Sequence, residues 1–186
     1  MQDFVHLHVH TQYSLLDGQA SVARLVDKAM QNGMKGIAVT DHGNMFGIKE
    51  FTNYVNKKNS GPKGEIKDLK KRIAGIESGE IECEDKEAEI ADCRAKMAEA
   101  ESKLFKPIVG CEMYVARRTM DKKEGKPDKS GYHLIVLAKN EKGYHNLIKL
   151  VSHAWTRGYY MRPRTDRSEL EKYHEGLIVC SACIGG

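Results

Sequence analysis

The sequence predicts an α/β protein that forms part of a larger βα barrel. Short apolar segments alternate with amphipathic segments of helical period along most of the chain, which is typical of βα units with parallel strands. We count about five such units, too few to close a barrel of this type. The sequence also ends just beyond an apolar strand, at Gly185 and Gly186, as expected for the first part of a longer chain.

The first predicted element is a strand over residues 4–10 that carries three histidines. Polar and apolar residues alternate strictly here, so one face of the strand is apolar and His6, His8 and His10 share the other face. His8 and His10 are two positions apart, which places their side chains on one side at a spacing of about 6.6 Å. Two imidazoles at that spacing can share one metal ion or flank a metal cluster, so we predict a metal site here.

A helix, a strand and a second helix follow. The helix covers residues 21–32, with Ser21 as its N-cap and Gly33 at its end. Residues 36–40 are apolar and short enough for a buried strand, and residues 45–57 continue as a second helix. The later elements are strands over residues 107–110, 113–115, 133–137 and 177–180, and a helix over residues 143–156.

Residues 60–106 interrupt this alternation. Apolar residues recur there at spacings of three and four in two runs, separated by Gly79, and the residues between them are mostly charged or small. We predict an antiparallel helical hairpin inserted into a βα connection, against the alternative of a disordered charged loop. The two runs are Ile66, Leu69, Ile73, Ile76 and Ile90, Cys93, Met97, Ala100, Leu104.

Composition excludes several classes of protein. The chain has 186 residues, 40% of them hydrophobic and 30% charged, with a net charge of +4, as in an ordinary soluble domain. No apolar run approaches the length of about 18 residues that a membrane span needs, and no secretory signal is visible. Five cysteines are an odd and sparse set, which argues against a disulfide scaffold and for a reducing compartment.

Further ligand-type residues stand at the ends of successive predicted strands. Asp17 follows the first strand, Asp41 and His42 follow the second, Glu112 lies after the next apolar segment, and His133 opens another. Barrel enzymes place functional groups on the loops that follow their strands. Asp17 alone could be a turn residue and Asp41 alone a helix cap. Together, however, these residues strengthen the prediction of a metal site.

Several motifs resemble the polymerase and histidinol phosphatase (PHP) domain, in the form found at the N-terminus of bacterial replicative DNA polymerases. They are His-Leu-His-Val-His-Thr from His6, Ser-Leu-Leu-Asp-Gly from Ser14, Thr-Asp-His-Gly-Asn from Thr40, Lys-Pro-Ile-Val-Gly-Cys-Glu from Lys106 and Gly-Tyr-His-Asn-Leu from Gly143. The segments 159–167 and 175–183 resemble the polymerase form rather than the phosphatases. The resemblance covers nearly the whole chain except the insertion.

The resemblance implies a distorted (β/α)7 barrel that binds two or three divalent ions of zinc, manganese or iron. Cys183 stands where other family members have a histidine. Asp41 is expected to orient His42, and His6 to support the ligands without binding metal. The positions that match the metal ligands of the family are His8, His10, Asp17, His42, Glu112, His133 and Cys183.

The family completes its site with a late Asp-x-His motif, which this sequence does not contain. We therefore expect residues 1–186 to be a PHP domain truncated before its last ligands, in a longer polymerase chain that uses magnesium for synthesis. The expected partners are DNA, the remainder of that chain and other subunits of the replicative polymerase, in the cytoplasm and without a membrane.

The activity implied by the resemblance is metal-dependent phosphoester hydrolysis, in this context a 3′–5′ proofreading exonuclease that is inactive in the isolated fragment. Two alternatives remain open. One is a non-catalytic module in which metal only braces the fold beside the polymerase domain, and the other is a small-molecule phosphatase.

Two weaker signals lie near the C-terminal end. Basic and aromatic residues interleave there, which suits contact with nucleic acid, although a solvated surface has the same pattern. These candidate residues are Arg157, Tyr159, Arg162 and Arg164. Cys180 and Cys183 form a Cys-x-x-Cys pair, but a second such pair for a structural zinc site is missing, so we predict that Cys180 belongs to the core.

Overall fold

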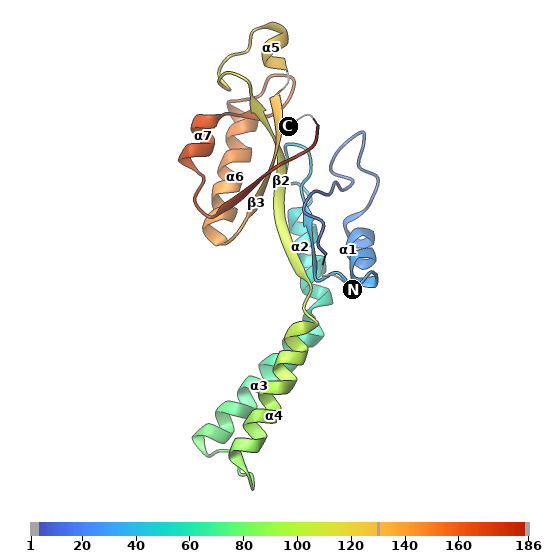
Figure 1. Cartoon of the computed structure of the whole chain (residues 1–186), viewed down its shortest axis with the longest axis vertical. Helices are drawn as coiled ribbons and strands as arrows, with labels where there is room; N and C mark the ends of the chain where they lie inside the picture. The colour runs from blue at the N-terminus through green and yellow to red at the C-terminus, as the bar shows by residue number, and fades with distance from the viewer. Residues whose placement is uncertain (1–3, 130, 185–186) are drawn as a thin grey trace. The chain divides into compact units, whose positions relative to one another are not determined.

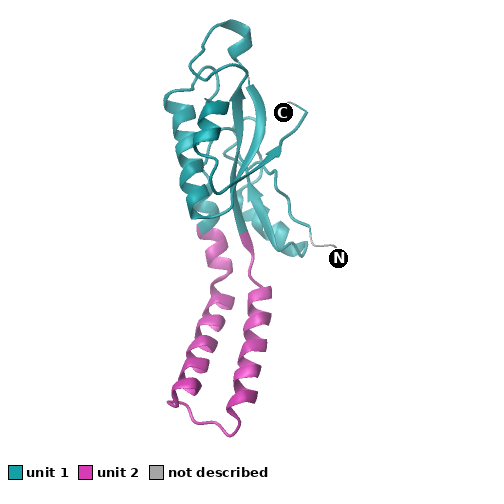
Figure 2. Ribbon diagram, turned by 60° about the vertical axis from the view of Figure 1, so that its left-hand side comes forward, with its two compact units in different colours: residues 1–52, 107–186 teal, residues 53–106 magenta. Residues whose placement is uncertain are grey.

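The computed structural model describes residues 4–129 and 131–184, and the chain divides into two compact units (Figures 1 and 2). Unit 1 comprises Met1–Thr52 and Pro107–Gly186, and unit 2 comprises Asn53–Lys106. Across the part of the chain that is described, no helix combines the length and the apolar character required to cross a membrane.

A five-stranded sheet organises unit 1, with the strand order β1-β2-β3-β5 and β4 paired with β2. The predicted helix over residues 21–32 and the predicted strand over residues 36–40 are confirmed, and Ser21 caps the helix by accepting a hydrogen bond from the backbone N–H of Arg24. The elements are α1 (Val22–Gln31), β1 (Gly36–Val39), α2 (Ile48–Lys58), β2 (Lys106–Ala116), α5 (Gly125–Lys129), β3 (Gly131–Ala138), α6 (Glu141–Thr156), β4 (Arg164–Thr165), α7 (Arg167–Lys172) and β5 (Leu177–Ser181).

The sheet is mixed, so the expectation of parallel strands throughout is wrong. β3 runs antiparallel to both β2 and β5, whereas β4 is parallel to β2. The connection from β2 to β3 carries only the short helix α5 and returns at the same end of the sheet, so that Ala116 pairs with Gly131. Gly131 is needed there, because a Cβ atom at this position would lie 2.2 Å from the carbonyl oxygen of Val115.

The predicted strand over residues 4–10 is also wrong, because this segment is irregular and bends at Leu7 and His8. It does run beside β1, since the backbone N–H of Ala38 donates to His6 and that of Thr40 donates to Val9. The hydroxyl of Thr40 accepts from the N–H of Val9 at 2.8 Å. A side chain therefore takes the place of a backbone acceptor, and the regular ladder of a strand pair does not form.

The two faces of the central strands differ in chemistry. Cys111 and Met113 of β2 pack with Val136 of β3 and with Leu147 and Leu150 of α6, and all five are buried. Figure 1 shows α6 on this side of β2 and β3. Alternation along β2 and β3 places Glu112, Tyr114 and His133 on the opposite face. One side of the sheet thus packs against α6, and the other carries these polar side chains next to a smaller buried hydrophobic cluster.

Unit 2 contains the helices α3 (Ser60–Ser78) and α4 (Lys86–Ser102), which lie side by side (Figure 2). The most buried side chains between them come from the predicted apolar positions Ile76, Cys93 and Ala100. Asp85 caps α4, and Gly79 ends α3 in the left-handed conformation that favours glycine. At the base of the unit, the side-chain amide of Asn59 exchanges two hydrogen bonds with the backbone of Phe105. That residues 60–106 form an insertion within a PHP domain stays a prediction.

Candidate metal centre

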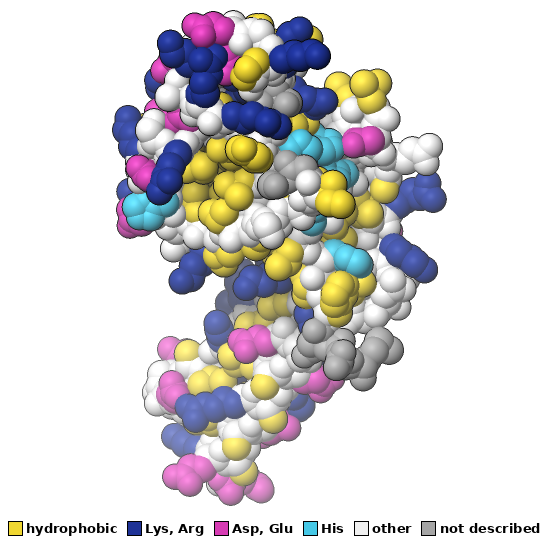
Figure 3. Space-filling model, turned by 45° about the horizontal axis from the view of Figure 1, so that its top comes forward, with side chains coloured by type: hydrophobic (Ala, Val, Ile, Leu, Met, Phe, Trp, Pro, Cys, Tyr) yellow, Lys and Arg dark blue, Asp and Glu magenta, His cyan; other side chains and the backbone are white. Residues whose placement is uncertain are grey.

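Four histidines surround the carboxylate of Glu112, whose side chain is only 1% exposed. Oε2 of Glu112 lies 2.8 Å from Nε2 of His8, 2.8 Å from Nε2 of His10 and 3.3 Å from Nδ1 of His42. Oε1 lies 2.6 Å from Nδ1 of His133. The structure therefore brings together five of the predicted ligands, and Figure 3 shows His side chains gathered on one face of the molecule.

The mixed sheet accounts for this convergence. Glu112 projects from β2, and His133 stands on the adjacent strand β3, paired with Tyr114 on the same face. His42 follows β1 and forms a parallel bridge with Glu112, whose backbone N–H donates to the carbonyl of Asp41. The bent N-terminal segment then places His8 and His10 over the same carboxylate.

The spacing of the ligand-type atoms is compatible with a metal site. Nε2 of His8 and Nε2 of His10 are 3.0 Å apart, and each is 2.8 Å from Oε2 of Glu112. Ligands with bonds of about 2.05 Å stand about 2.9 Å apart around an octahedral ion and about 3.3 Å apart around a tetrahedral one. A second group of possible ligands within the described residues consists of Glu112, His133 and Cys183, with all ligand atoms within 4.8 Å of one another.

Two buried atoms of the cluster support a cation as the missing partner. Nδ1 of His42 and Oε1 of Glu112 find no hydrogen-bond partner among the described residues, although Oε1 lies close to His133. Such buried polar atoms are costly unless something satisfies them. Imidazole, carboxylate and thiolate together form a donor set that suits zinc, manganese or iron. The residues present therefore fit the divalent ions that the sequence predicts.

The side-chain carboxyl group of Glu112 is ionised in this setting. Burial alone would raise the pKa of its carboxyl group, but hydrogen bonds from His10 and His8 and the charge of His42 lower that pKa to about 2. The hydrogen bond with Glu112 also raises the pKa of His10. The carboxylate is thus available to bind a cation near neutral pH.

Asp17 joins the cluster through His42. Oδ2 of Asp17 lies 2.8 Å from Nε2 of His42, and the Asp17 side chain is 57% exposed. Asp17, which by its sequence context alone could be a turn residue, thus faces the predicted site. Because His42 contacts Glu112 through one ring nitrogen and Asp17 through the other, it links the buried and the exposed carboxylates.

Asp41 does not contact the His42 ring, contrary to the expected orienting role. Its buried carboxylate accepts hydrogen bonds from the backbone and the hydroxyl of Thr11 and from the hydroxyl of Ser14. The Ser14 oxygen lies 2.8 Å from Nδ1 of His10. Because Ser14 gives its only proton to Asp41, it must accept from Nδ1–H of His10, which leaves Nε2 of His10 free to bind a metal. Asp41 therefore orients His10 through Ser14.

We expect Ser14→Ala to weaken metal binding by about 10- to 100-fold, as is usual when the hydrogen-bond partner of a ligand is lost. Isothermal titration with zinc or manganese measures this directly. Ser21→Ala is the matched control, since it removes the cap of α1 and lowers stability by about 1 kcal/mol without altering metal affinity. An unchanged affinity in the Ser14 variant would show that this serine does not orient His10.

Two other predicted residues lie elsewhere. His6 contacts the ring of Phe4 rather than the cluster, because the bend at Leu7 and His8 turns it away from His8 and His10. Arg164 was predicted to contact nucleic acid, but it is 0% exposed and donates to four backbone carbonyl groups. Its guanidinium is therefore structural, since no donor faces solvent.

The two cysteines of the Cys-x-x-Cys pair separate. Cys183 lies beside the cluster, with Sγ 3.5 Å from Nδ1 of His133. Cys180 instead packs against the small buried cluster of Ala38, Ile135 and Leu137. Because only one of the two thiols faces the histidines, the pair is not arranged as half of a separate zinc site.

An open pocket of about 530 Å³ adjoins the cluster. Asp17, His42 and His133 line it together with Tyr159 and Arg162, two of the residues predicted to contact nucleic acid. Arg157, which was also predicted to contact nucleic acid, pairs with Glu169 of α7. The sequence analysis missed Tyr114, which also lines the pocket and accepts a hydrogen bond from Arg162 at 2.7 Å. Tyr114 lies two residues after Glu112 on one strand, which places both side chains on the same face, and this spacing is the sequence signal that could have identified it.

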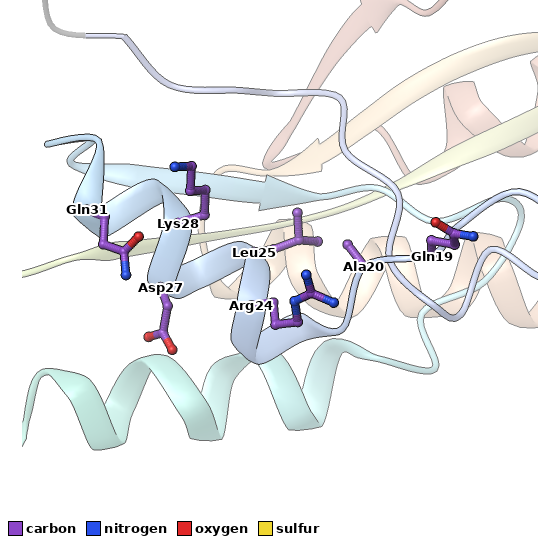
Figure 4. Close-up of a pocket in the computed structure, with 7 residues that line it drawn as sticks. All are labelled: Gln19, Ala20, Arg24, Leu25, Asp27, Lys28 and Gln31. Atoms are coloured by element: carbon purple, nitrogen blue, oxygen red, sulfur yellow. The ribbon is translucent and has the colours of Figure 1, made fainter.

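A second pocket, of about 570 Å³, runs along α1 (Figure 4). Its described lining is polar and aliphatic, and Asp27 is the one carboxylate in it. It holds no set of converging ligand atoms like that around Glu112. The chemistry of unit 1 is therefore concentrated at the histidine cluster.

Comparisons with known proteins identify the family of the chain. The model of the PHP domain family matches residues 6–186. The chain is 42% identical to DNA polymerase III subunit alpha of Borreliella burgdorferi and 39% identical to that of Treponema pallidum, in both cases across 98% of this chain and 12% of the relative. The subunit from Aquifex aeolicus is 36% identical across 100% of the chain and 13% of the relative. The chain thus spans about an eighth of the length of these relatives. It belongs to the PHP domain family.

Proposed function

We propose that this chain is the PHP domain of a bacterial replicative DNA polymerase alpha subunit, and that its metal centre hydrolyses phosphodiester bonds at the 3′ end of DNA. The observation that carries the proposal is the cluster of four histidines around Glu112 beside an open pocket. The name and similarity of the relatives support the polymerase context.

Two ligand groups would hold divalent ions, and both use Glu112. His8 and His10 complete the first group, and His133 and Cys183 complete the second. Asp17 and His42 stand next to them as a further pair. A bound zinc, manganese or iron ion supplies Lewis-acid activation of water and of phosphoryl oxygens. The polymerase reaction itself would use magnesium at a separate site in the remainder of the chain.

The protein side chains supply binding and orientation. Ser14 and Asp41 hold the His10 ring in one tautomer, as derived above. Arg162 presents a guanidinium at the pocket and is itself held by the hydroxyl of Tyr114. A cation at that position can bind a phosphate group of the DNA backbone. The buried Glu112 offsets part of the positive charge that the metal ions would bring.

The proposed partners follow from the same context. DNA is the substrate, and the remainder of the alpha subunit and other subunits of the polymerase are the protein partners, in the cytoplasm. The family completes its site with an Asp-x-His motif, which we place in the remainder of the polymerase chain. The isolated chain would then bind fewer ions and excise DNA poorly.

A side-by-side measurement on the full-length subunit and on this chain tests the proposal. We expect mass spectrometry to find two or three equivalents of zinc, manganese or iron in the full-length subunit and fewer in this chain. The full-length subunit should shorten a 5′-labelled oligonucleotide from its 3′ end in manganese. A metal-loaded subunit that leaves the oligonucleotide intact would contradict the exonuclease and favour a structural module. Hydrolysis of small phosphomonoesters alone would indicate a phosphatase.

A further inference from the structure

Three aromatic side chains form an exposed surface on the pocket that adjoins the metal centre. Phe46 is 62% exposed, Trp155 41% and Tyr159 48%, and all three line this pocket. The Trp155 and Tyr159 rings are stacked with centroids 5.6 Å apart, and the Phe46 ring lies 6.0 Å from Trp155. Aromatic side chains of this size are usually buried, so their exposure together needs an explanation.

The surface is held in place rather than loosely exposed. The indole N–H of Trp155 donates to the carbonyl of Gly43 at 2.7 Å, directly after His42 in the chain. Gly43 itself has a positive φ of 61°, and its N–H donates to the carbonyl of Glu112. The position of the indole is therefore tied to the same backbone that positions the ligands, and little order would be lost when a flat ligand binds.

Charge and composition indicate what kind of ligand fits. Arg162 and Tyr159 line the pocket together with Asp17, His42 and His133 of the candidate metal centre. An exposed aromatic surface, one guanidinium and a candidate cation-binding cluster together match a nucleotide, in which a base is joined to a phosphate. An apolar segment of a protein would match the aromatic rings but would bring no anionic group to Arg162 or to the metal centre.

We propose that Phe46, Trp155 and Tyr159 form a stacking surface for the bases at the 3′ end of a single-stranded DNA whose phosphate reaches the metal centre. This inference rests on the proposed function for its substrate, but it concerns binding and not hydrolysis. Stacking on aromatic rings does not depend on the base identity, so the surface would accept all four bases, as a proofreading site requires.

Trp155 is the only tryptophan of the chain, so its fluorescence reports the surface directly. The probe is a short single-stranded oligodeoxynucleotide in calcium, compared with one of equal length that has abasic residues at its 3′ end. We expect the normal oligonucleotide to quench Trp155 and the abasic one to bind about 5- to 100-fold more weakly, which corresponds to the usual contribution of one stacked base. Equal affinity and equal quenching for both would overturn the proposal.

Substitutions distinguish base stacking on this surface from nonspecific binding of DNA to exposed aromatic side chains. Phe46→Leu and Tyr159→Leu keep the tryptophan reporter and should each weaken binding of the normal oligonucleotide about five-fold or more, but not binding of the abasic one. Tyr132→Leu is the matched control, because Tyr132 is 49% exposed and lies under Arg117, outside the lining of this pocket. Circular dichroism verifies that each variant is folded. Equal losses with Tyr132→Leu would overturn the proposal.

The outcome for this surface is distinguishable from that for hydrolysis. If oligonucleotides quench Trp155 but are never shortened by the full-length subunit, the stacking surface stands and the exonuclease fails. The subunit could instead shorten DNA while the Phe46 and Tyr159 variants, and the abasic oligonucleotide, bind as tightly as the unmodified protein and the normal oligonucleotide do. In that case the exonuclease stands and the stacking surface fails.

Discussion

Replacing His8 and His10 together by alanine should reduce manganese-dependent 3′ excision by the full-length subunit to the level without enzyme. Both imidazoles contact Oε2 of Glu112 at 2.8 Å, so the double variant removes one of the two ligand groups that use this carboxylate. Nucleotide incorporation should stay largely intact, because the proposed polymerase reaction would use separate carboxylates in the remainder of the subunit. A labelled primer, followed with and without nucleotides, measures both activities in one preparation.

The matched control is His145→Ala with His174→Ala. It removes the same number of imidazoles from exposed positions outside the cluster: His145 pairs with Glu141 on α6, and His174 contacts the backbone of Glu171. This control should keep both its metal content and its excision. Unchanged excision in the His8 and His10 variant would exclude the cluster as the catalytic centre.

Arg164→Met should lower the free energy of unfolding by about 3 kcal/mol or more, because it leaves several buried carbonyl groups without a donor. The guanidinium donates to the carbonyls of Gly158, Met120, Lys122 and Asp128. It thereby ties the connection between β2 and β3 to β4. Burial lowers the pKa of Arg164, as expected for a cation removed from water, yet the group stays charged near neutral pH. Chemical denaturation of the chain, followed by circular dichroism, gives the value.

Arg167→Met is the control for the Arg164 variant. Arg167 is 91% exposed, and its ion pair with Glu171 is of the surface type that contributes little to stability. Its loss should change the free energy of unfolding by less than about 0.5 kcal/mol. If both variants lower the free energy of unfolding by the same amount, the hydrogen bonds of Arg164 contribute no more to stability than a surface ion pair does.

Local pattern predicted most of the elements, since the residues that form them carry the signal themselves. Ser21 and Gly33 mark the ends of α1, and the apolar residues of β1, β3 and β5 lie where the runs of Val, Ile and Leu predicted strands. Strand direction was beyond local pattern, because β3 pairs with β2 through the return of the chain at Gly131. The N-terminal segment also failed as a strand, because its partner Thr40 offers a hydroxyl where a ladder needs a carbonyl.

The sequence by itself determined which residues could bind metal, since the residue types and their motifs name His8, His10, Glu112 and His133 without any coordinates. Only the tertiary structure decided that these three histidines contact the carboxylate of Glu112, that Ser14 orients His10, and that Arg164 is internal. The physical reason is the distance along the chain over which each property is set. The properties of a side chain and the period of its element are local, whereas distances between ligands and the burial of a charge depend on how β1, β2, β3 and the N-terminal segment pack together.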